Sequence, residues 1–301
     1  MPDENSSSSL LPANRIRQFA LASVVVAAAF GWPLFRLIRF AAHDDLFSYI
    51  LLIPLVSLYL ARLLAPQIPA VSPPGKKWAV VFLAGGLAAL GGQFLRPGSL
   101  LPDSLVGPMI AFVLFVCGAG FMFLGGPAMR VLAFPFFLLV FMVPFPGVLT
   151  GAIETWLQHA SAAAASWFFV LAGMPVYHDE LVFQLPDITL QIAPECSGIH
   201  SSMVLLIVSL VAGHLFLQHP WKRAVLTLAV IPLAFLRNGF RVFVLGELCV
   251  HIGPRMIDTP IHHQGGPLFF VVSLIPFSLL LYFLMKSERP KNSGPPASTG
   301  K

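Results

Sequence analysis

Long apolar segments recur along this chain from Phe19 to Met285, and they constrain its fold more than any other feature. A helix needs about 20 mostly apolar residues to cross about 30 Å of hydrocarbon. Only 10% of the 301 residues are charged, whereas a soluble domain has about 25%. The sequence therefore predicts an all-α polytopic membrane protein with about eight transmembrane helices. The expected spans are residues 19–35, 46–64, 78–95, 104–125, 131–149, 199–217, 224–249 and 266–285.

We expect a single transmembrane catalytic domain over residues 18–286, between two disordered cytoplasmic tails, 1–17 and 287–301. The tails are rich in polar residues and have no apolar period, so neither has a face to bury. The apolar run that follows Arg15 and Arg17 is interpreted as a retained first helix rather than a signal peptide, because many more spans follow it.

The Lys and Arg residues between the spans predict how the chain is oriented in the bilayer. With a cytoplasmic N-terminus and eight crossings, the inner loops and tails hold twice as many of these residues as the outer side, in agreement with the positive-inside rule. Orientation in the bilayer accounts for the formal net charge of +5, so we expect no nucleic-acid binding.

Two segments between residues 149 and 199 have patterns unlike the spans. Residues 152–173 place Glu154, Gln158 and Ser161 on one helix face, which predicts an amphipathic helix in the membrane interface, although a tilted span also fits. The runs 181–185 and 188–192 are rich in β-forming residues and flank a Pro-Asp turn, which predicts a small β-hairpin on the outer side.

Cys196 is the first candidate for chemistry, because it lies just before a predicted span. The positive end of the helix dipole favours the thiolate, which is the nucleophilic form. Ser197 and Gly198 follow it, and the glycine would let a substrate backbone approach closely. Cys117 and Cys249 lie within apolar runs, where we expect them to be small buried side chains.

Two arginines within the predicted span 224–249 form the second candidate. An Arg inside a span costs several kcal/mol, so Arg237 and Arg241 need a reason to be there. Together with Asn238 they share one helix face. Arg241 lies toward the outer end of the span, where it could snorkel to the interface, but Arg237 lies a turn deeper.

The third candidate is the histidine pair His262-His263, just before the last span. These side chains could act as an acid and base, bind a metal or simply be solvated in a loop. The predicted topology places them on the same side as Cys196 and Arg241. A thiolate, an imidazole and a guanidinium can supply a nucleophile, a proton carrier and an anion stabiliser.

These elements, taken in order, resemble the exosortase/archaeosortase family over about residues 20–285. The resemblance lies in Cys196-Ser197-Gly198, in Asn238-Gly239-Phe240-Arg241, and in His262 followed by Gly266 and Phe270. Similar stretches are ILLIPLVSLYL from Ile50 and the Gly-Met-Pro-Val-Tyr sequence from Gly173.

The resemblance implies a membrane-embedded cysteine transpeptidase or peptidase in the inner membrane that needs no cofactor or metal. Its partners would be exported proteins whose C-terminal tails carry a short motif, a hydrophobic helix and a basic end, as in PEP-CTERM tails, together with membrane lipid. On this reading Cys196 is the nucleophile, Arg241 stabilises the transition state and His262 is the acid/base residue. His263 is the alternate to His262. Supporting positions are Ser197, Gly198, Arg237 and Asn238, with Arg237 as a second cation for a substrate carboxylate.

Two other classes of protein fit part of the pattern. A transporter or channel would also tolerate an intramembrane Arg, but it would predict paired charges near the midplane, and the spans hold almost no carboxylate besides Glu247. A metal-dependent membrane hydrolase could use Cys196, His200, His262 and His263 as ligands.

Overall fold

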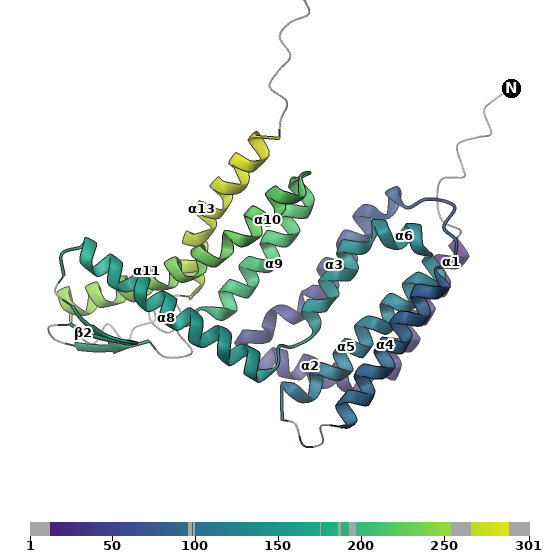
Figure 1. Ribbon diagram of the computed structural model, residues 1–301, viewed down its shortest axis with the longest axis horizontal. Coiled ribbons are helices and arrows are strands. Elements are labelled where there is room, and N and C mark those ends of the chain that lie inside the picture. The colour runs from purple at the N-terminus through teal and green to yellow at the C-terminus, as the bar shows by residue number, and fades with distance from the viewer. Residues whose placement is uncertain are drawn as a thin grey trace, which may run out of the picture. The chain divides into compact units, whose positions relative to one another are not determined.

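The computed structural model describes residues 13–95, 98, 100–174, 176–185, 188–192, 197–253 and 266–288. Most of these residues are helical, and the chain divides into two compact units, Met1–Thr150 and Gly151–Lys301 (Figure 1). The single transmembrane catalytic domain expected over residues 18–286 stays a prediction. The first helix begins at Ala13, so the last residues of the predicted tail 1–17 are helical. From residue 289 onward the other tail lies outside the described residues.

The first unit is built from helices, of which α4 and α5 pack side by side (Figure 1). Gly86 permits their close approach, because a Cβ atom at this position would lie 2.6 Å from the Phe115 ring. The elements of this unit are α1 (Ala13–Ala29), α2 (Gly31–His43), η1 (Asp45–Leu51), α3 (Ile53–Leu64), η2 (Ala65–Gln67), α4 (Lys76–Phe94), α5 (Asp103–Ala119), η3 (Gly120–Leu124), α6 (Gly126–Val131), α7 (Ala133–Leu138) and η4 (Leu139–Met142).

The span predicted over residues 19–35 is not one straight helix. Helices α1 and α2 meet at Phe30 with a bend of 74°. Gly31 and Pro33 explain the break, because glycine weakens a helix and proline cannot donate to the carbonyl one turn earlier. The helix that was expected to continue straight therefore changes direction after Ala29.

The span predicted over residues 131–149 is wrong at its C-terminal end. The helical segment ends at Met142, and α8 (Gly147–Leu171) begins beyond Pro144 and Pro146, neither of which has an N–H group to donate. The helix predicted over residues 152–173 is therefore confirmed as a helix, with an earlier start. Its placement in the membrane interface stays a prediction.

The polar stripe of α8 faces the protein rather than water. Gln158 and Ser161 are buried, whereas Trp156 and Trp167 are about half exposed. The stripe had been the reason to expect an amphipathic interfacial helix. The buried Gln158 side chain donates a hydrogen bond inside the second unit, whereas the buried Ser161 hydroxyl has no hydrogen-bond partner among the described residues.

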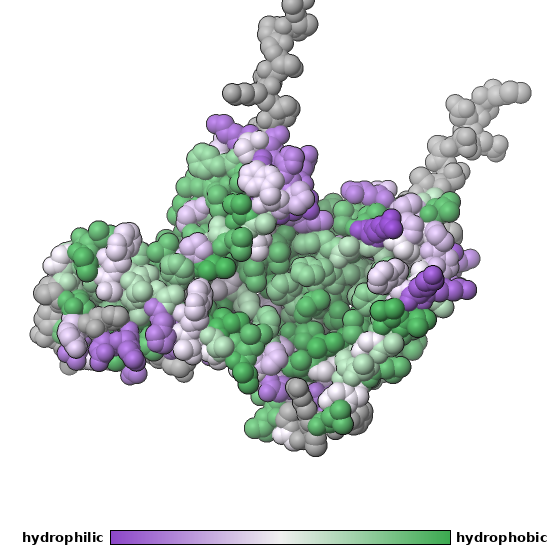
Figure 2. Space-filling view, viewed as in Figure 1, coloured by the Kyte–Doolittle hydropathy of each residue, from purple (hydrophilic) through white to green (hydrophobic). Residues whose placement is uncertain are grey.

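Among the described residues, five helical segments are long and apolar enough to cross a membrane, or up to seven if each of two bent pairs forms one span. Apolar side chains also cover most of the face of both units seen in Figure 2. These findings confirm the all-α polytopic membrane fold, and the expected number of eight spans is approximate. Helix α4, which was expected to span, is not among the five. They are Asp45–Gln67, Asp103–Leu124, Ile199–Phe216, Pro220–His251 and Gly266–Lys286.

The second unit combines helices with a small antiparallel sheet in the order β1-β2-β3. The predicted hairpin is present, with Phe183 opposite Leu190. A third strand, which the sequence analysis did not predict, pairs with its outer edge. The elements after α8 are β1 (Tyr177–Asp179), β2 (Val182–Leu185), β3 (Ile188–Gln191), α9 (Ile199–Phe216), α10 (Pro220–Leu228), α11 (Val230–His251) and α13 (Gly266–Lys286).

The sheet is fastened to α8 by apolar packing and by one buried hydrogen bond. Phe169 of α8 packs against Phe183 of β2 in the same buried cluster as Ile192. The Nε2 atom of Gln158 donates to the Ile192 carbonyl over 3.2 Å. The end of the hairpin is therefore held in place directly before the segment that contains Cys196.

Helix α11 packs against α8 at a glycine. A Cβ atom at Gly239 would lie 2.6 Å from the Cβ atom of Ala164, 2.9 Å from the Ala165 nitrogen and 2.9 Å from the Ser161 carbonyl oxygen. Backbone atoms cannot move aside cheaply, so this contact requires glycine. The Gly239 position thereby determines how closely the arginine-bearing helix approaches α8.

We expect Gly239→Ala to destabilise the protein by about 1–3 kcal/mol, as overpacking of a close-packed interior does. Gly213→Ala is the matched control, because a Cβ atom on this α9 glycine would meet Arg223 at an ordinary 3.7 Å. Free energies of unfolding in detergent micelles would measure both. Equal stability of the two variants would contradict the packing assigned to Gly239.

Glu288 links the end of α13 to the start of α10. Its carboxylate accepts hydrogen bonds from the backbone N–H groups of Gln218 and His219 at 2.9 and 3.1 Å and lies 3.7 Å from Lys222 Nζ. The Gln218 hydrogen bond, together with His219 and Lys222, lowers the pKa of Glu288 against the opposing effect of desolvation. The ionised carboxylate therefore acts as a cap for α10 supplied by a distant segment.

Because the folded pKa of Glu288 is depressed, its stabilising effect is present above the pKa of the unfolded chain and is lost as the pH falls through the folded value. We expect Glu288→Gln to unfold at a lower temperature than the wild type at pH 7. The difference in unfolding temperature between the two proteins should shrink as the pH falls below 7 into acid, as measured by thermal unfolding in detergent at several pH values. A difference that does not depend on pH would contradict the role of the carboxylate charge.

Candidate active site

Gly198 forms the N-terminal cap of α9 in a conformation that favours glycine, with a φ of 74°. Its carbonyl oxygen accepts hydrogen bonds from Ser202 N at 3.0 Å, Ser202 Oγ at 2.7 Å and Ser201 Oγ at 3.1 Å. Ser197, directly before it, is 1% exposed. The residue that follows Cys196 is thus buried and the next one is held at the first turn of a predicted span.

Arg237 of α11 joins this cap from the neighbouring helix. Its Nη2 atom donates to the Gly198 carbonyl over 3.1 Å and lies 3.4 Å from Ser202 Oγ. The residue is only 8% exposed. The sequence analysis placed Arg237 on the face of Arg241 as a supporting cation, and the contact with Gly198 gives it a further, structural role.

The other terminal nitrogen of Arg237, Nη1, is buried and has no hydrogen-bond partner within the part of the chain that the structure describes. A buried donor without a partner costs about 1–3 kcal/mol, and more when it is charged. The same guanidinium therefore holds the start of α9 with one nitrogen and leaves the other without a partner in the described part of the chain.

Asn238, another of the predicted site residues, also lies beside Gly198. It is 2% exposed, and a Cβ atom at Gly198 would lie 3.3 Å from its Cγ and Oδ1 atoms. A side chain at position 198 would also lie 3.0 Å from Arg237 Nη2. Gly198 is thus required both by its backbone conformation and by the close approach of α11.

The structure therefore brings together four of the predicted residues, namely Ser197, Gly198, Arg237 and Asn238. Arg241 lies one helical turn beyond Arg237 on α11 and is partly buried. Cys196, His262 and His263 lie outside the described residues, so their roles stay predictions. Cys117 and Cys249 are buried, as expected.

Two contacts at this site involve residues to which the sequence analysis gave no role there. Ser202 lies one turn after Gly198 and shares Arg237 with it, and Gln158 holds the hairpin end. A serine one turn from a helix cap is a weak signal, because many serines satisfy their own helix in this way. Gln158 did stand out as polar in an apolar helix, but its partner is 34 residues away.

A second polar pair lies near the end of α11, where the sequence analysis assigned His251 no role. Its Nδ1 atom lies 3.3 Å from Glu247 Oε2, and both residues line a hollow of about 510 Å³ beside Gly173 and Met174. His251 is well exposed. His251 therefore offers a control histidine for testing the proposed role of His262 by substitution.

The metal-dependent alternative rests on Cys196, His200, His262 and His263. Among the residues that the structure describes, no group of three or more His, Cys, Asp or Glu side chains is placed to hold a metal ion. Only His200 of the four proposed ligands belongs to that part of the chain. This alternative stays an untested prediction.

Comparison with known proteins identifies the family. The model of the transmembrane exosortase family matches residues 41–279, which is well over half of the chain and includes the α9 cap and the α11 arginines. No curated protein and no solved structure matches. The chain is thus a multi-pass membrane protein and a membrane-embedded sorting enzyme in the general sense of that family. It belongs to the transmembrane exosortases.

Proposed function

We propose that this protein cleaves the C-terminal sorting tails of exported proteins, of the PEP-CTERM kind, and transfers the shortened proteins to an acceptor. The reaction takes place on the outer face of the inner membrane. The observation that carries the proposal is the hydrogen bond from Arg237 to Gly198, in a chain matched to the exosortase family. It joins an arginine-bearing helix to the cap two residues after Cys196.

Cys196 is the proposed nucleophile. It directly precedes Ser197 and Gly198 at the start of α9, an 18-residue helix whose N-terminus carries partial positive charge. The Arg237 guanidinium adds a full positive charge at the same cap. Both effects favour the thiolate over the thiol.

The proposed reaction has two steps with a thioester between them. The thiolate of Cys196 attacks the scissile carbonyl carbon, and Arg241 stabilises the negative charge that develops on the carbonyl oxygen. His262 gives a proton to the leaving amine, which departs with the tail. It then takes a proton from the acceptor, which attacks the thioester and restores the thiolate; water as acceptor gives hydrolysis.

Arg237 is a positioning residue in this proposal. Its Nη2 atom holds the Gly198 carbonyl and Ser202, while the buried Nη1 atom is available for a substrate carboxylate. The low dielectric of the surroundings strengthens such a charge–charge contact. A motif with an acidic residue next to the cleavage site would provide the matching group.

We expect Cys196→Ala to lower tail cleavage by about a thousandfold or more, because the covalent step is lost. Cys117→Ala, which changes a buried thiol in the first unit, should cleave at the wild-type rate. Immunoblotting of a tagged tail substrate in whole cells would measure both. Normal tail removal by Cys196→Ala would eliminate the proposed mechanism.

The same assay separates the histidines. His262→Ala should lose cleavage. His251→Ala should retain it, because His251 is the last residue of α11, where it pairs with Glu247 and has no role in the proposed reaction. Loss of cleavage in His263→Ala, with activity retained in His262→Ala, would assign the proton transfer to His263.

A membrane-impermeant thiol reagent should label position 196 from outside the cell, and labelling only from the cytosol would contradict the proposed orientation.

We expect Arg237→Gln to reduce cleavage roughly 10- to 100-fold, because the α9 cap loses its charged donor. It should also slow alkylation of Cys196 at a fixed pH, since less thiolate forms. Arg62→Gln, at an exposed position on α3, is the control and should change neither rate. Slower cleavage with unchanged alkylation would contradict the proposed effect of Arg237 on the thiol.

A further inference from the structure

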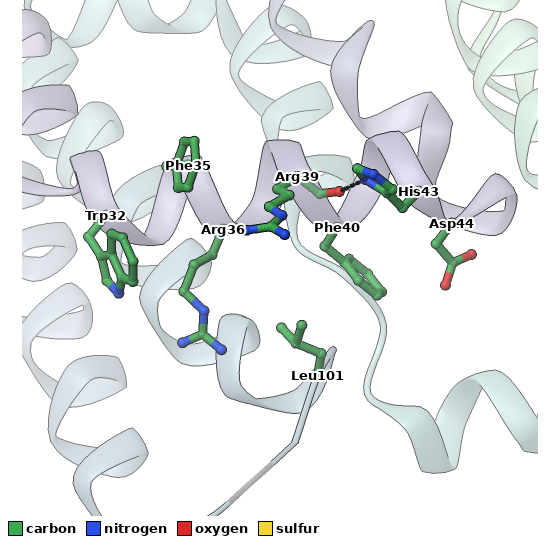
Figure 3. A pocket seen from close by; sticks show the side chains of 8 residues that line it. All are labelled: Trp32, Phe35, Arg36, Arg39, Phe40, His43, Asp44 and Leu101. Atoms are coloured by element: carbon green, nitrogen blue, oxygen red, sulfur yellow. Dashed lines mark hydrogen bonds between the residues drawn. The ribbon is translucent and has the colours of Figure 1, made fainter.

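A hollow of about 630 Å³ lies along one face of α2, within the first unit and apart from the proposed active site in sequence (Figure 3). Its lining combines cationic, aromatic and aliphatic side chains. Positions 32, 36, 39 and 43 repeat at helical spacing and so share this face. Residues that define the hollow are Trp32, Arg36, Arg39, Phe40, His43 and Leu101.

The arginines of this hollow carry positive charge without an acidic partner. Among the described residues, neither Arg36 nor Arg39 forms an ion pair with an Asp or Glu side chain. Arg36 Nη2 lies 3.3 Å from the Ser104 hydroxyl, a neutral partner. The hollow is therefore a cationic site that is prepared for an anion.

The acidic group nearest to these arginines along the chain is already engaged. Asp44 lines the same hollow, but its Oδ1 atom accepts a hydrogen bond from Leu46 N at 3.0 Å and begins η1. His43 is oriented by a contact of 2.8 Å between its Nδ1 atom and the Arg39 carbonyl, drawn as the dashed line in Figure 3. Two arginines and one aspartate leave the hollow with a net positive charge before any contribution from His43.

The surroundings of the hollow are apolar on the exposed side of α2. Leu37 and Ala41 are buried against the unit, whereas Trp32 is 70% exposed and Phe35 and Ile38 are each more than half exposed. The 74° bend after α1 turns this helix away from the direction of the preceding span. A helix that exposes aromatic and aliphatic groups beside arginines is typical of the membrane interface.

We propose that this hollow binds the phosphate headgroup of an anionic membrane phospholipid. Guanidinium groups bind phosphate through paired, charge-assisted hydrogen bonds. The exposed Trp32 side chain suits the level of the headgroups, where the acyl chains would lie beside it. A volume of about 630 Å³ lies in the range of small-molecule sites. The exposed apolar rim favours a lipid over a free phosphate ion.

The test uses the full-length protein purified in a neutral detergent, with lipid binding followed by native mass spectrometry. Phosphatidylglycerol is the anionic probe and phosphatidylcholine the zwitterionic one. The wild type should bind phosphatidylglycerol in preference to phosphatidylcholine. The double variant Arg36→Gln/Arg39→Gln should bind it roughly tenfold more weakly, since each arginine near an anionic lipid surface contributes on the order of 1 kcal/mol.

Two further variants separate loss of the site from loss of the fold. Arg39→Gln removes one exposed guanidinium and should weaken binding by a severalfold factor with an unchanged gel-filtration profile. Arg62→Gln on α3 should bind as the wild type does. Wild-type binding by the double variant, or equal binding of both lipids, would overturn the proposal. Displacement of phosphatidylglycerol by inorganic phosphate at equal concentration would assign the site to a free anion and would also overturn it.

Discussion

The hydrogen bond between Arg237 and Gly198 is the contact on which the proposed site depends. It connects α11 with the first turn of α9 and places a buried guanidinium beside the residues that follow Cys196. An arginine in a membrane helix is costly unless it has partners. The Gly198 carbonyl and Ser202 account for one terminal nitrogen, and the other has no hydrogen-bond partner among the described residues. The free-energy cost of burying Arg237 falls beside the residues where the proposed reaction needs a positive charge.

Several close approaches support this contact. Gly198 has no side chain to separate the cap from Arg237 and Asn238, and Gly239 lets α11 lie against the backbone of α8. Gln158 of α8 then holds the end of the hairpin. Cys196 therefore lies in sequence between two anchored residues, Ile192 and Gly198.

The sequence predicted the membrane class from apolar length and the hairpin from two strand-forming runs around a turn, because these are local signals. The predicted topology and the family resemblance placed Ser197 and Gly198 in one site with Arg237 and Asn238, and Gly198 does lie against these two residues. The sequence did not predict the bend at Phe30 or the break before Gly147, because long apolar runs masked the effects of proline on helix continuity. The polar stripe of α8 was assigned to the membrane interface, yet Gln158 and Ser161 are buried, and Gln158 donates to the Ile192 carbonyl. A periodic pattern identifies a helix face but not what covers it. The Arg237–Gly198 contact spans 39 residues, and such pairings follow from tertiary packing.

Direct detection of the covalent intermediate is the sharpest test of the account. The purified enzyme would be mixed with a tail substrate, quenched in acid and digested for mass spectrometry. We expect a substrate acyl group on the peptide that contains Cys196, released by hydroxylamine as a thioester should be. Turnover of the substrate with the acyl group on another residue, or with no hydroxylamine-sensitive adduct under conditions that trap the intermediate, would contradict it.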